Sequence, residues 1–426
     1  MADGAGTQAG PVMMSEAMTS EQRPALMTGA PPFPVEHAVT LANWQDPPFN
    51  RWAFQHLREL IPSARIARRE DAVRQFPRNG RELGRLAFSF NDEQLTVAEL
   101  LDATWTDGFL VLHRGRVVTE QYFNGMRPQT PHLLMSISKS VTAAVAGILA
   151  GRGVLDVSAE VTQIVPELRG TSFAGATVQH LLDMRAGTKF NEDYDDPAAD
   201  VRTYERVYLW RPPSPADGRS DADDALSYFG TLENDGPHGG PFRYRSILTD
   251  VLAWMIERAA GDRLHELISR ELWQPMGAEF DAEITLDRRG NPMADGGVSA
   301  TLRDLARFGQ LFLRRGRVGR RRVVPAWWVD DTVRGAPDGP RAFAEGDEGS
   351  GFPPGSHYRN CWWVRDPALP FFHGSGINGQ GVFVHVPSQT VVAKLSTWPV
   401  AWGEELYGRT VAGVLAIADA LAAGLA

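Results

Sequence analysis

The chain has 426 residues, of which 43% are hydrophobic and 22% charged, so it has the composition of a globular protein with a large core. This composition excludes fibrous and wholly disordered classes. The formal charge of −9 gives no overall electrostatic reason to bind nucleic acid. The single cysteine, Cys361, excludes an intramolecular disulfide and a thiolate metal centre. No basic residue precedes Arg23, and no uncharged apolar run approaches the ~18 residues of a membrane span, so we expect a cytoplasmic protein without membrane contact.

The first structural signals are a hairpin and a buried helix. Residues 1–37 are rich in Gly, Ala, Pro, Met and Ser without an apolar period, and we interpret them as a disordered leader. Alternating apolar residues at 109–112 and 117–123, separated by Arg114 and Gly115, predict two paired strands. Residues 136–151 are small and apolar on nearly all sides, as in a helix buried between two layers.

The remaining pattern places helices between two strand-forming ends. Residues 154–281 have helical periodicity, including amphipathic stretches at 178–184 and 248–272. After a helix at 301–313, residues 381–386 and 390–395 alternate as strands, and a helix closes the chain at 409–425. We therefore predict an α/β lobe from residues 38–153 and 282–426, with an all-helical lobe, 154–281, inserted between them.

Lysine is rare enough to be informative. Of the 43 basic residues only Lys139, Lys189 and Lys394 are lysine, so arginine serves wherever a plain positive charge suffices. Lys139 follows Ser136 by three residues, which places both on one face of the predicted helix. We expect the apolar surroundings to desolvate the amine and favour its neutral, basic form, while the Ser136 N–H at the helix start faces outward. An ordinary capping serine with a solvated lysine is the alternative.

Two further segments could contribute chemistry. Tyr244 stands before the helical stretch 248–272, where a strand-to-helix corner could aim a phenol as a proton relay, although a half-buried loop tyrosine is the simpler interpretation. Residues 373–381 are dense in glycine, which would let a substrate backbone lie close to the following strand. A tight turn explains the glycines equally well.

Together these segments resemble the penicillin-recognising serine hydrolases, which include class C β-lactamases, D-alanyl-D-alanine peptidases and related esterases. Within that superfamily the chain is most similar to the nylon-oligomer (6-aminohexanoate-dimer) hydrolases, from about residue 40 to the end. The longer matching stretches are 41–48, 50–54, 133–136, 191–194, 250–254 and 296–299.

The resemblance implies a β-lactamase/transpeptidase-like fold: an antiparallel sheet flanked by helices, with an inserted helical domain and the site in the cleft between them. It also implies the roles of individual residues. Ser136 would be the nucleophile, Lys139 its base and Tyr244 the proton relay, while the N–H groups of Ser136 and Ile377 would bind the oxyanion. On the substrate side it implies Tyr194 in a mobile lid, Glu205 as the acceptor of an amino group, and Asp295.

The chain departs from the β-lactamase pattern at two motifs. Tyr244-Arg245-Ser246 stands in place of Y-x-N, and Gly374-Ser375-Gly376 in place of K-T-G. The missing lysine of the second motif would help to hold a ligand carboxylate, so its absence argues against a β-lactamase. Glu205 and Asp295 also vary from the nylon-type pattern, which leaves the substrate open.

We therefore predict a serine hydrolase that cleaves linear amides resembling 6-aminohexanoate oligomers, or short esters, without a metal or other cofactor. A carboxylesterase with no amide preference is the first alternative. A non-catalytic or anion-binding module is the second, based on the run from Arg314 to Arg322; a solvated turn between a helix and a strand explains that run better. We expect a small-molecule substrate, no nucleic-acid partner, and a homodimer as the candidate assembly.

Overall fold

The computed structural model describes residues 25–213, 224–346 and 351–425. The chain divides into two compact units, Met1–Val39 and Thr40–Ala426. Most of the predicted leader, residues 1–24, lies outside the described residues, while Val35–His37 forms a single 3-10 turn. Apart from residues 38 and 39, both predicted lobes fall within the second unit, and their boundaries at residues 154 and 281 stay a prediction.

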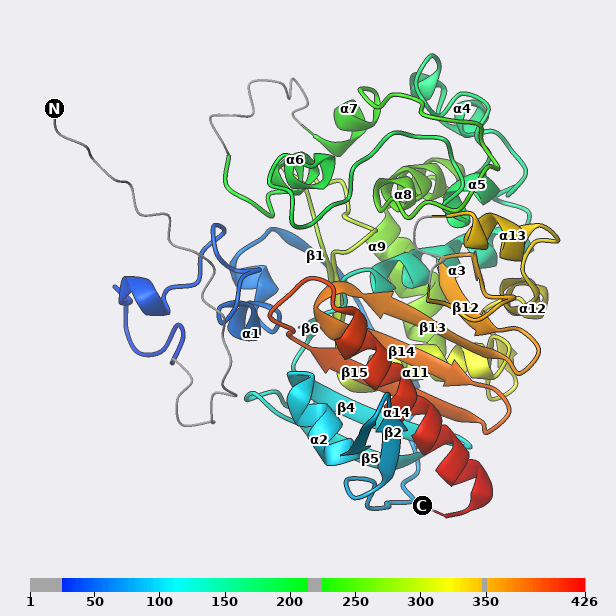
Figure 1. Ribbon diagram of the computed structural model, residues 1–426. Coiled ribbons are helices and arrows are strands. Elements are labelled where there is room, and N and C mark those ends of the chain that lie inside the picture. The colour runs from blue at the N-terminus through cyan, green and yellow to red at the C-terminus, as the bar shows by residue number, and fades with distance from the viewer. Residues whose placement is uncertain (1–24, 214–223, 347–350, 426) are drawn as a thin grey trace, which may run out of the picture. The chain divides into compact units, whose positions relative to one another are not determined.

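A seven-stranded antiparallel sheet is the centre of the second unit (Figure 1). Its order is β11-β12-β13-β14-β15-β4-β5, so a hairpin from the first third of the chain pairs with strands from the last. The β4–β5 and β14–β15 hairpins are those predicted from the alternating residues. The bounds are β4 Thr106–His113, β5 Arg116–Tyr122, β11 His357–Arg359, β12 Trp362–Asp366, β13 Phe371–Gly376, β14 Gln380–His385 and β15 Thr390–Ser396.

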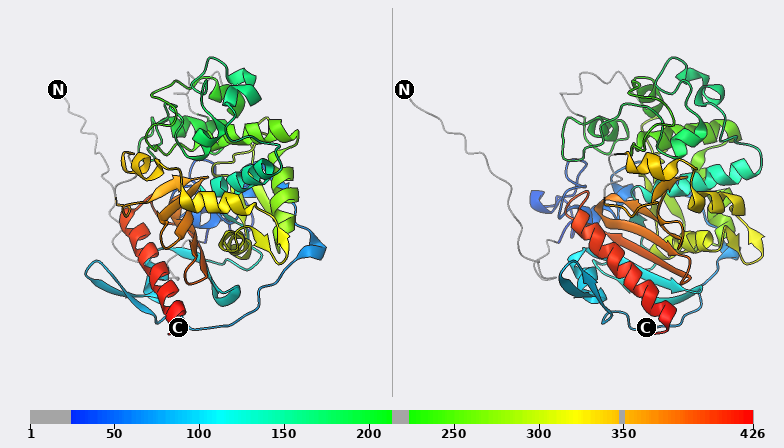
Figure 2. Two further views of the ribbon diagram at one scale, coloured as in Figure 1. Left: turned by 90° about the vertical axis from the view of Figure 1, so that its right-hand side faces the viewer. Right: turned by 45° about the vertical axis from the view of Figure 1, so that its right-hand side comes forward.

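Helices cover both faces of this sheet (Figure 1, Figure 2). The C-terminal helix α14, Glu404–Ala423, and α2, Val97–Ala103, pack on one face, where Val411, Val414 and Ile417 join the apolar core formed by β4 and β15. By length and composition alone α14 could cross a membrane; here its apolar side packs on the sheet. On the other face α11, Leu302–Leu313, contacts β15, β14 and β4, and α3, Ile137–Gly151, contacts β13.

Smaller sheets and short helices complete the α/β part. A four-stranded antiparallel sheet has the order β1-β7-β8-β6, with bounds Ser63–Ile66, Ala282–Thr285, Val298–Ala300 and His132–Leu133. The arginine run begins directly after α11 and includes a short hairpin, β9 Arg317–Val318 with β10 Arg321–Arg322. The helix α12, Ala326–Arg334, follows the run. The other elements are α1 Asn50–Ala53, η3 Leu57–Glu59, η4 Glu70–Ala72, β2 Ala87–Phe90, β3 Glu93–Thr96 and α13 Gly339–Ala344.

Between residues 154 and 281 the named elements that the structure describes are helices, joined by long stretches of turn and irregular chain. One expectation here is wrong: residues 248–272 do not form one helix. The helix α8, Ile247–Ala260, ends because Gly261 adopts a left-handed conformation, with φ of 68°, and the chain restarts as α9 and a π-helical turn. The elements are α4 Val161–Ile164, η5 Pro166–Leu168, α5 Val178–Leu182, α6 Asp200–Val207, α7 Ala225–Phe229, α9 Leu264–Leu267, η7 Ile268–Trp273 and α10 Gln274–Met276.

Candidate active site

Ser136 occupies the N-cap position of the buried helix α3. The residue before it, Met135, has a left-handed backbone with φ of 48°, so the chain turns sharply into the helix. Met135 and Ile137 are buried, whereas Ser136 is half-buried, and the turn therefore leaves its hydroxyl accessible. One turn of α3 is tied to the second sheet, because the Val298 N–H donates to Ser138 Oγ at 3.0 Å. The nucleophile candidate thus stands on a rigid support.

Lys139 lies one helical turn after Ser136 and is only 1% exposed. Its Nζ donates to Ser136 Oγ at 2.9 Å and to the Asp295 carbonyl oxygen at 2.9 Å. The predicted i, i+3 contact between serine and lysine is present, and the backbone of Asp295 holds the amine in that direction. The pair has the geometry of a nucleophile and a neighbouring base.

The expectation that Lys139 is neutral is wrong. Burial lowers the pKa of its amine, but the electrostatic interactions with Tyr244, Asp295 and Glu192 outweigh burial and raise that pKa above its ordinary value. Asp295 Oδ2 is 3.9 Å from Nζ, and that carboxylate is invisible to a sequence argument that counts only apolar neighbours on the helix. Lys139 is therefore protonated in the resting site near neutral pH.

Tyr244 completes a three-residue cluster. Its hydroxyl interacts with Ser136 and Lys139, and the Lys139 Nζ lies 5.1 Å from the centre of its ring. The ring stacks on Trp363 at 5.5 Å. Burial raises the pKa of the phenol to about 12, although the Lys139 charge opposes the rise. Tyr244 precedes α8 as expected, but it follows irregular chain and not a strand.

The glycine-rich segment forms the end of β13 and the turn that starts at Ile377. Gly376 lies directly against the start of α3: a Cβ at this position would be 2.6 Å from the Leu134 carbonyl oxygen and 3.0 Å from the Ser136 nitrogen. Only glycine allows the strand to come so close. Gly376 therefore lies against the backbone of Ser136, and Ile377, the second oxyanion donor that the resemblance implies, follows it in the chain.

Asp295 and Asp250 form a buried acidic pair behind Lys139. Asp250, on α8, accepts hydrogen bonds from the Ala294 N–H at 2.6 Å and the Asp295 N–H at 3.1 Å, and the Tyr204 hydroxyl donates to it at 2.9 Å. Burial and the Asp295 charge raise the pKa of Asp250, so the two carboxyl groups titrate as a coupled pair. The sequence predictions give Asp250 no role. An acidic residue inside the apolar helix α8 is nevertheless a signal that could have indicated a buried functional carboxylate.

Glu192 is a second carboxylate that sequence reasoning missed. Its Oε2 accepts the Ser246 N–H at 2.5 Å, and its Oε1 accepts the hydroxyls of Ser246 and, at 2.9 Å, Tyr194. Burial raises its pKa, while the Lys139 charge opposes the rise. Tyr194 is half-buried in irregular chain before α6 and points its hydroxyl to this carboxylate. Glu192 lies in the matching stretch 191–194, but no sequence pattern gives it a role.

Glu205, the predicted acceptor of an amino group, already has two cationic partners. Arg202 Nη1 donates to both carboxylate oxygens, to Oε1 at 3.0 Å and to Oε2 at 2.9 Å. Arg211 forms a further ion pair with Oε2. Arg202 also donates to the Tyr194 carbonyl oxygen. Glu205 is close enough for its charge to act on both Asp295 and Tyr194. Its negative charge is thus largely balanced, which the sequence did not suggest.

Asp295 has one cationic neighbour, because its Oδ2 lies 3.9 Å from Lys139 Nζ. It is 5% exposed, and among the described residues its Oδ1 has no hydrogen-bond partner. Within the same part of the chain no group of three or more His, Cys, Asp or Glu side chains could hold a metal ion.

Comparison with known proteins identifies the family to which this chain belongs. The β-lactamase family model matches residues 95–412, which contain the Ser136–Lys139 pair, Tyr244 and the glycine-rich strand. The chain belongs to the β-lactamase family. The 6-aminohexanoate-dimer hydrolase of Paenarthrobacter ureafaciens is 41% identical to it over 385 residues, covering 90% of this chain and 93% of that protein.

Solved structures of other proteins agree with the fold. A Bacillus anthracis protein, whose assignment as a 6-aminohexanoate-dimer hydrolase is provisional, superposes with a TM-score of 0.81 at 28% identity, covering 90% of this chain and 97% of its own. A family VIII carboxylesterase superposes with a TM-score of 0.53 at 16% identity, covering 72% and 91%, and shares the fold alone. The predicted fold class and the resemblance are confirmed, and the protein is a serine hydrolase of amide or ester bonds.

Proposed function

We propose that this member of the β-lactamase family hydrolyses its substrate through an acyl-enzyme on Ser136. The 2.9 Å contact between Ser136 Oγ and Lys139 Nζ is the observation that carries the proposal. The hydroxyl attacks the substrate carbonyl, and its proton passes to the Lys139–Tyr244 pair. The N–H groups of Ser136 and Ile377 receive the oxyanion, Tyr244 protonates the leaving group, and water then releases the acyl group.

The proton balance of the site sets a condition on this step. Lys139 and Tyr244 both carry their protons at rest, because the pKa of each is above its ordinary value. The pair must lose one proton before it can accept that of Ser136, and it titrates as a unit. We therefore expect kcat/KM to rise with pH.

For the substrate we propose a linear amide with a free amino group, like the one for which the Paenarthrobacter relative is named. Three carboxylates, Glu192, Glu205 and Asp295, lie around the site, and Glu205 is balanced by Arg202 and Arg211. Asp295, whose Oδ1 has no partner among the described residues, is then the better acceptor for a substrate ammonium. Tyr194, on irregular chain, would close over the bound substrate.

A short-ester carboxylesterase is the second candidate. The pairing of Glu205 favours it, because the two arginines remove much of the negative charge that would select an amine. The protein should be incubated with 6-aminohexanoate dimer, a neutral short-chain ester and a chromogenic cephalosporin, alongside Ser136→Ala. Hydrolysis of the dimer supports the amidase, hydrolysis of the ester alone supports the esterase, and preference for the cephalosporin contradicts both.

The role of Asp295 can be tested in the same assay. Asp295→Asn should raise KM for the dimer roughly 10-fold or more while changing KM for the neutral ester little, because a desolvated charge pair contributes on the order of 1–3 kcal/mol. Glu205→Gln is the matched variant, and the balanced charge predicts a smaller effect. Equal effects of Asp295→Asn on both substrates would remove it from amine recognition.

Cytoplasmic location and a homodimer belong to the same proposal. The first is supported by the single thiol, Cys361, which is free and buried. Light scattering of the purified protein measures the second directly.

A further inference from the structure

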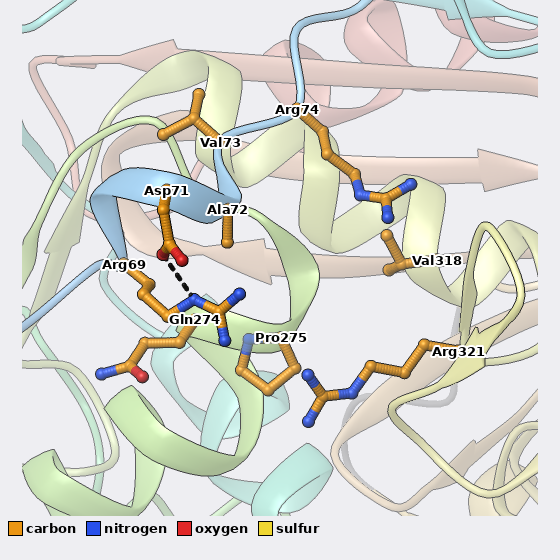
Figure 3. Close-up of a pocket in the computed structure, with 9 residues that line it drawn as sticks. All are labelled: Arg69, Asp71, Ala72, Val73, Arg74, Gln274, Pro275, Val318 and Arg321. Carbon is orange, nitrogen blue, oxygen red and sulfur yellow. Dashed lines mark ion pairs between the residues drawn. The ribbon is translucent and has the colours of Figure 1, made fainter.

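Two adjoining cavities away from the catalytic residues each have arginine at a third of their lining positions. The first, of about 340 Å³, is lined by Arg69, Arg74 and Arg321 among others (Figure 3). The second, of about 440 Å³, is lined by Arg74, Arg307, Arg314 and Arg317, and the two cavities share Arg74 and Val318. We call the pair the arginine groove. None of the residues of the candidate active site lines it.

The charges in the arginine groove do not balance. Six arginines line it, and Asp71 is the one carboxylate among its described lining residues. Asp71 is paired with Arg69 at 2.7 Å, and Arg307 is paired with Glu279 and Asp304.

The other four arginines, Arg74, Arg314, Arg317 and Arg321, have no ion pair with any residue that the structure describes. In a chain with a formal charge of −9, a groove with four unpaired guanidinium groups is a local exception. Guanidinium groups bind phosphate and carboxylate groups through paired N–H donors.

The position of Arg74 is set by its neighbours. Arg307 donates to the Arg74 carbonyl oxygen from Nε at 3.2 Å and from Nη2 at 2.6 Å, which fixes the backbone. A Cβ on Gly319 would lie 2.9 Å from Arg74 Nη1, so the guanidinium packs against the hairpin where there is no side chain. Figure 3 shows Arg69 and Arg321 reaching into the first cavity from opposite sides, near Pro275.

We infer that the arginine groove is a binding site for a small anion that carries two or three linked phosphate groups. Each phosphate group brings roughly one to two negative charges near neutral pH, so such a chain matches four unpaired arginines. The cavity volumes of about 340 and 440 Å³ fall in the range of small-molecule sites.

Isothermal titration calorimetry of the full-length protein with inorganic triphosphate tests this site, with inorganic phosphate and duplex DNA as separate arms. We expect saturable triphosphate binding that weakens with salt, and much weaker binding of phosphate. Arg74→Ala combined with Arg321→Ala should reduce triphosphate affinity at least 10-fold. Hydrolase activity of each variant reports that it is folded.

Arg320→Ala is the matched control, because Arg320 is exposed on the same hairpin and lines neither cavity. It should keep most of the triphosphate affinity. An equal loss in Arg320→Ala would show that net charge alone attracts the anion and would overturn the inference. Absence of saturable triphosphate binding, or tighter binding of duplex DNA that depends on the same arginines, would overturn it as well.

Discussion

The contact between Gly376 and the start of α3 gives a sharp prediction about catalysis. In Gly376→Ala the new Cβ would lie 2.6 Å from the Leu134 carbonyl oxygen and 2.9 Å from Met135 Cβ, whereas ordinary contacts begin at 3.4 Å. Two of the obstructing atoms, the Leu134 carbonyl oxygen and the Ser136 nitrogen, belong to the backbone and cannot rotate away. The strand β13 must therefore move away from α3 by roughly 0.5–1 Å. That movement separates the two proposed oxyanion donors, the N–H groups of Ser136 and Ile377.

The expected loss follows from the donors. Removing one oxyanion donor costs about 10²- to 10³-fold in kcat, and the overpacking itself costs roughly 1–3 kcal/mol of stability. The assay is kcat on an ester or amide substrate, normalised by the folded fraction from a thermal melt. Gly80→Ala is the matched control, because no atom lies within 4 Å of the Cβ that it adds. A folded Gly376→Ala with unchanged kcat would refute the oxyanion geometry.

Four further outcomes are expected. Lys139→Arg should lose roughly 10²-fold or more in turnover while remaining folded, because arginine cannot give up its proton. Near-normal turnover of this variant would show that charge alone suffices. Asp295→Asn should move the rising limb of the kcat/KM profile to lower pH by roughly one unit, since it removes a charge that holds the Lys139 proton. Tyr244→Phe should slow amides more than activated esters, whose leaving groups need less protonation, and equal losses in kcat would exclude the relay. Lys394 is fully buried, and burial lowers its pKa from 10.5 to about 7. Between these pH values the unfolded chain binds more protons than the folded one, so the free energy of unfolding of the wild type rises with pH. The free energy of unfolding of Lys394→Met should exceed the wild-type value by up to about 4 kcal/mol near pH 7, and the difference should close towards pH 10.5.

The sequence predicted the parts of the molecule that depend on local pattern. Alternation gave the β4–β5 and β14–β15 hairpins, and the small apolar residues gave α3 with Ser136 at its start. The spacing of Ser136 and Lys139 predicted their contact, because i and i+3 share a helical face.

The sequence could not predict the contacts that residues from distant segments of the chain make in the site. The carboxylates that keep the Lys139 proton come from Asp295 and Glu192, more than fifty residues away along the chain, so the amine is charged although its own helix is apolar. Arg211 reaches Glu205 from beyond the end of α6, and no periodicity marks that pairing. The break of α8 at Gly261 was also missed, because the apolar pattern continues on both sides of it.

Covalent labelling tests the assignment of the nucleophile most directly. The protein should be treated with a fluorophosphonate and examined by intact mass and by peptide mapping. We expect one adduct per chain, on Ser136, and none in Ser136→Ala, while Ser375→Ala should still be labelled at Ser136. An adduct on any other serine, or full hydrolase activity in folded Ser136→Ala, would contradict the assignment.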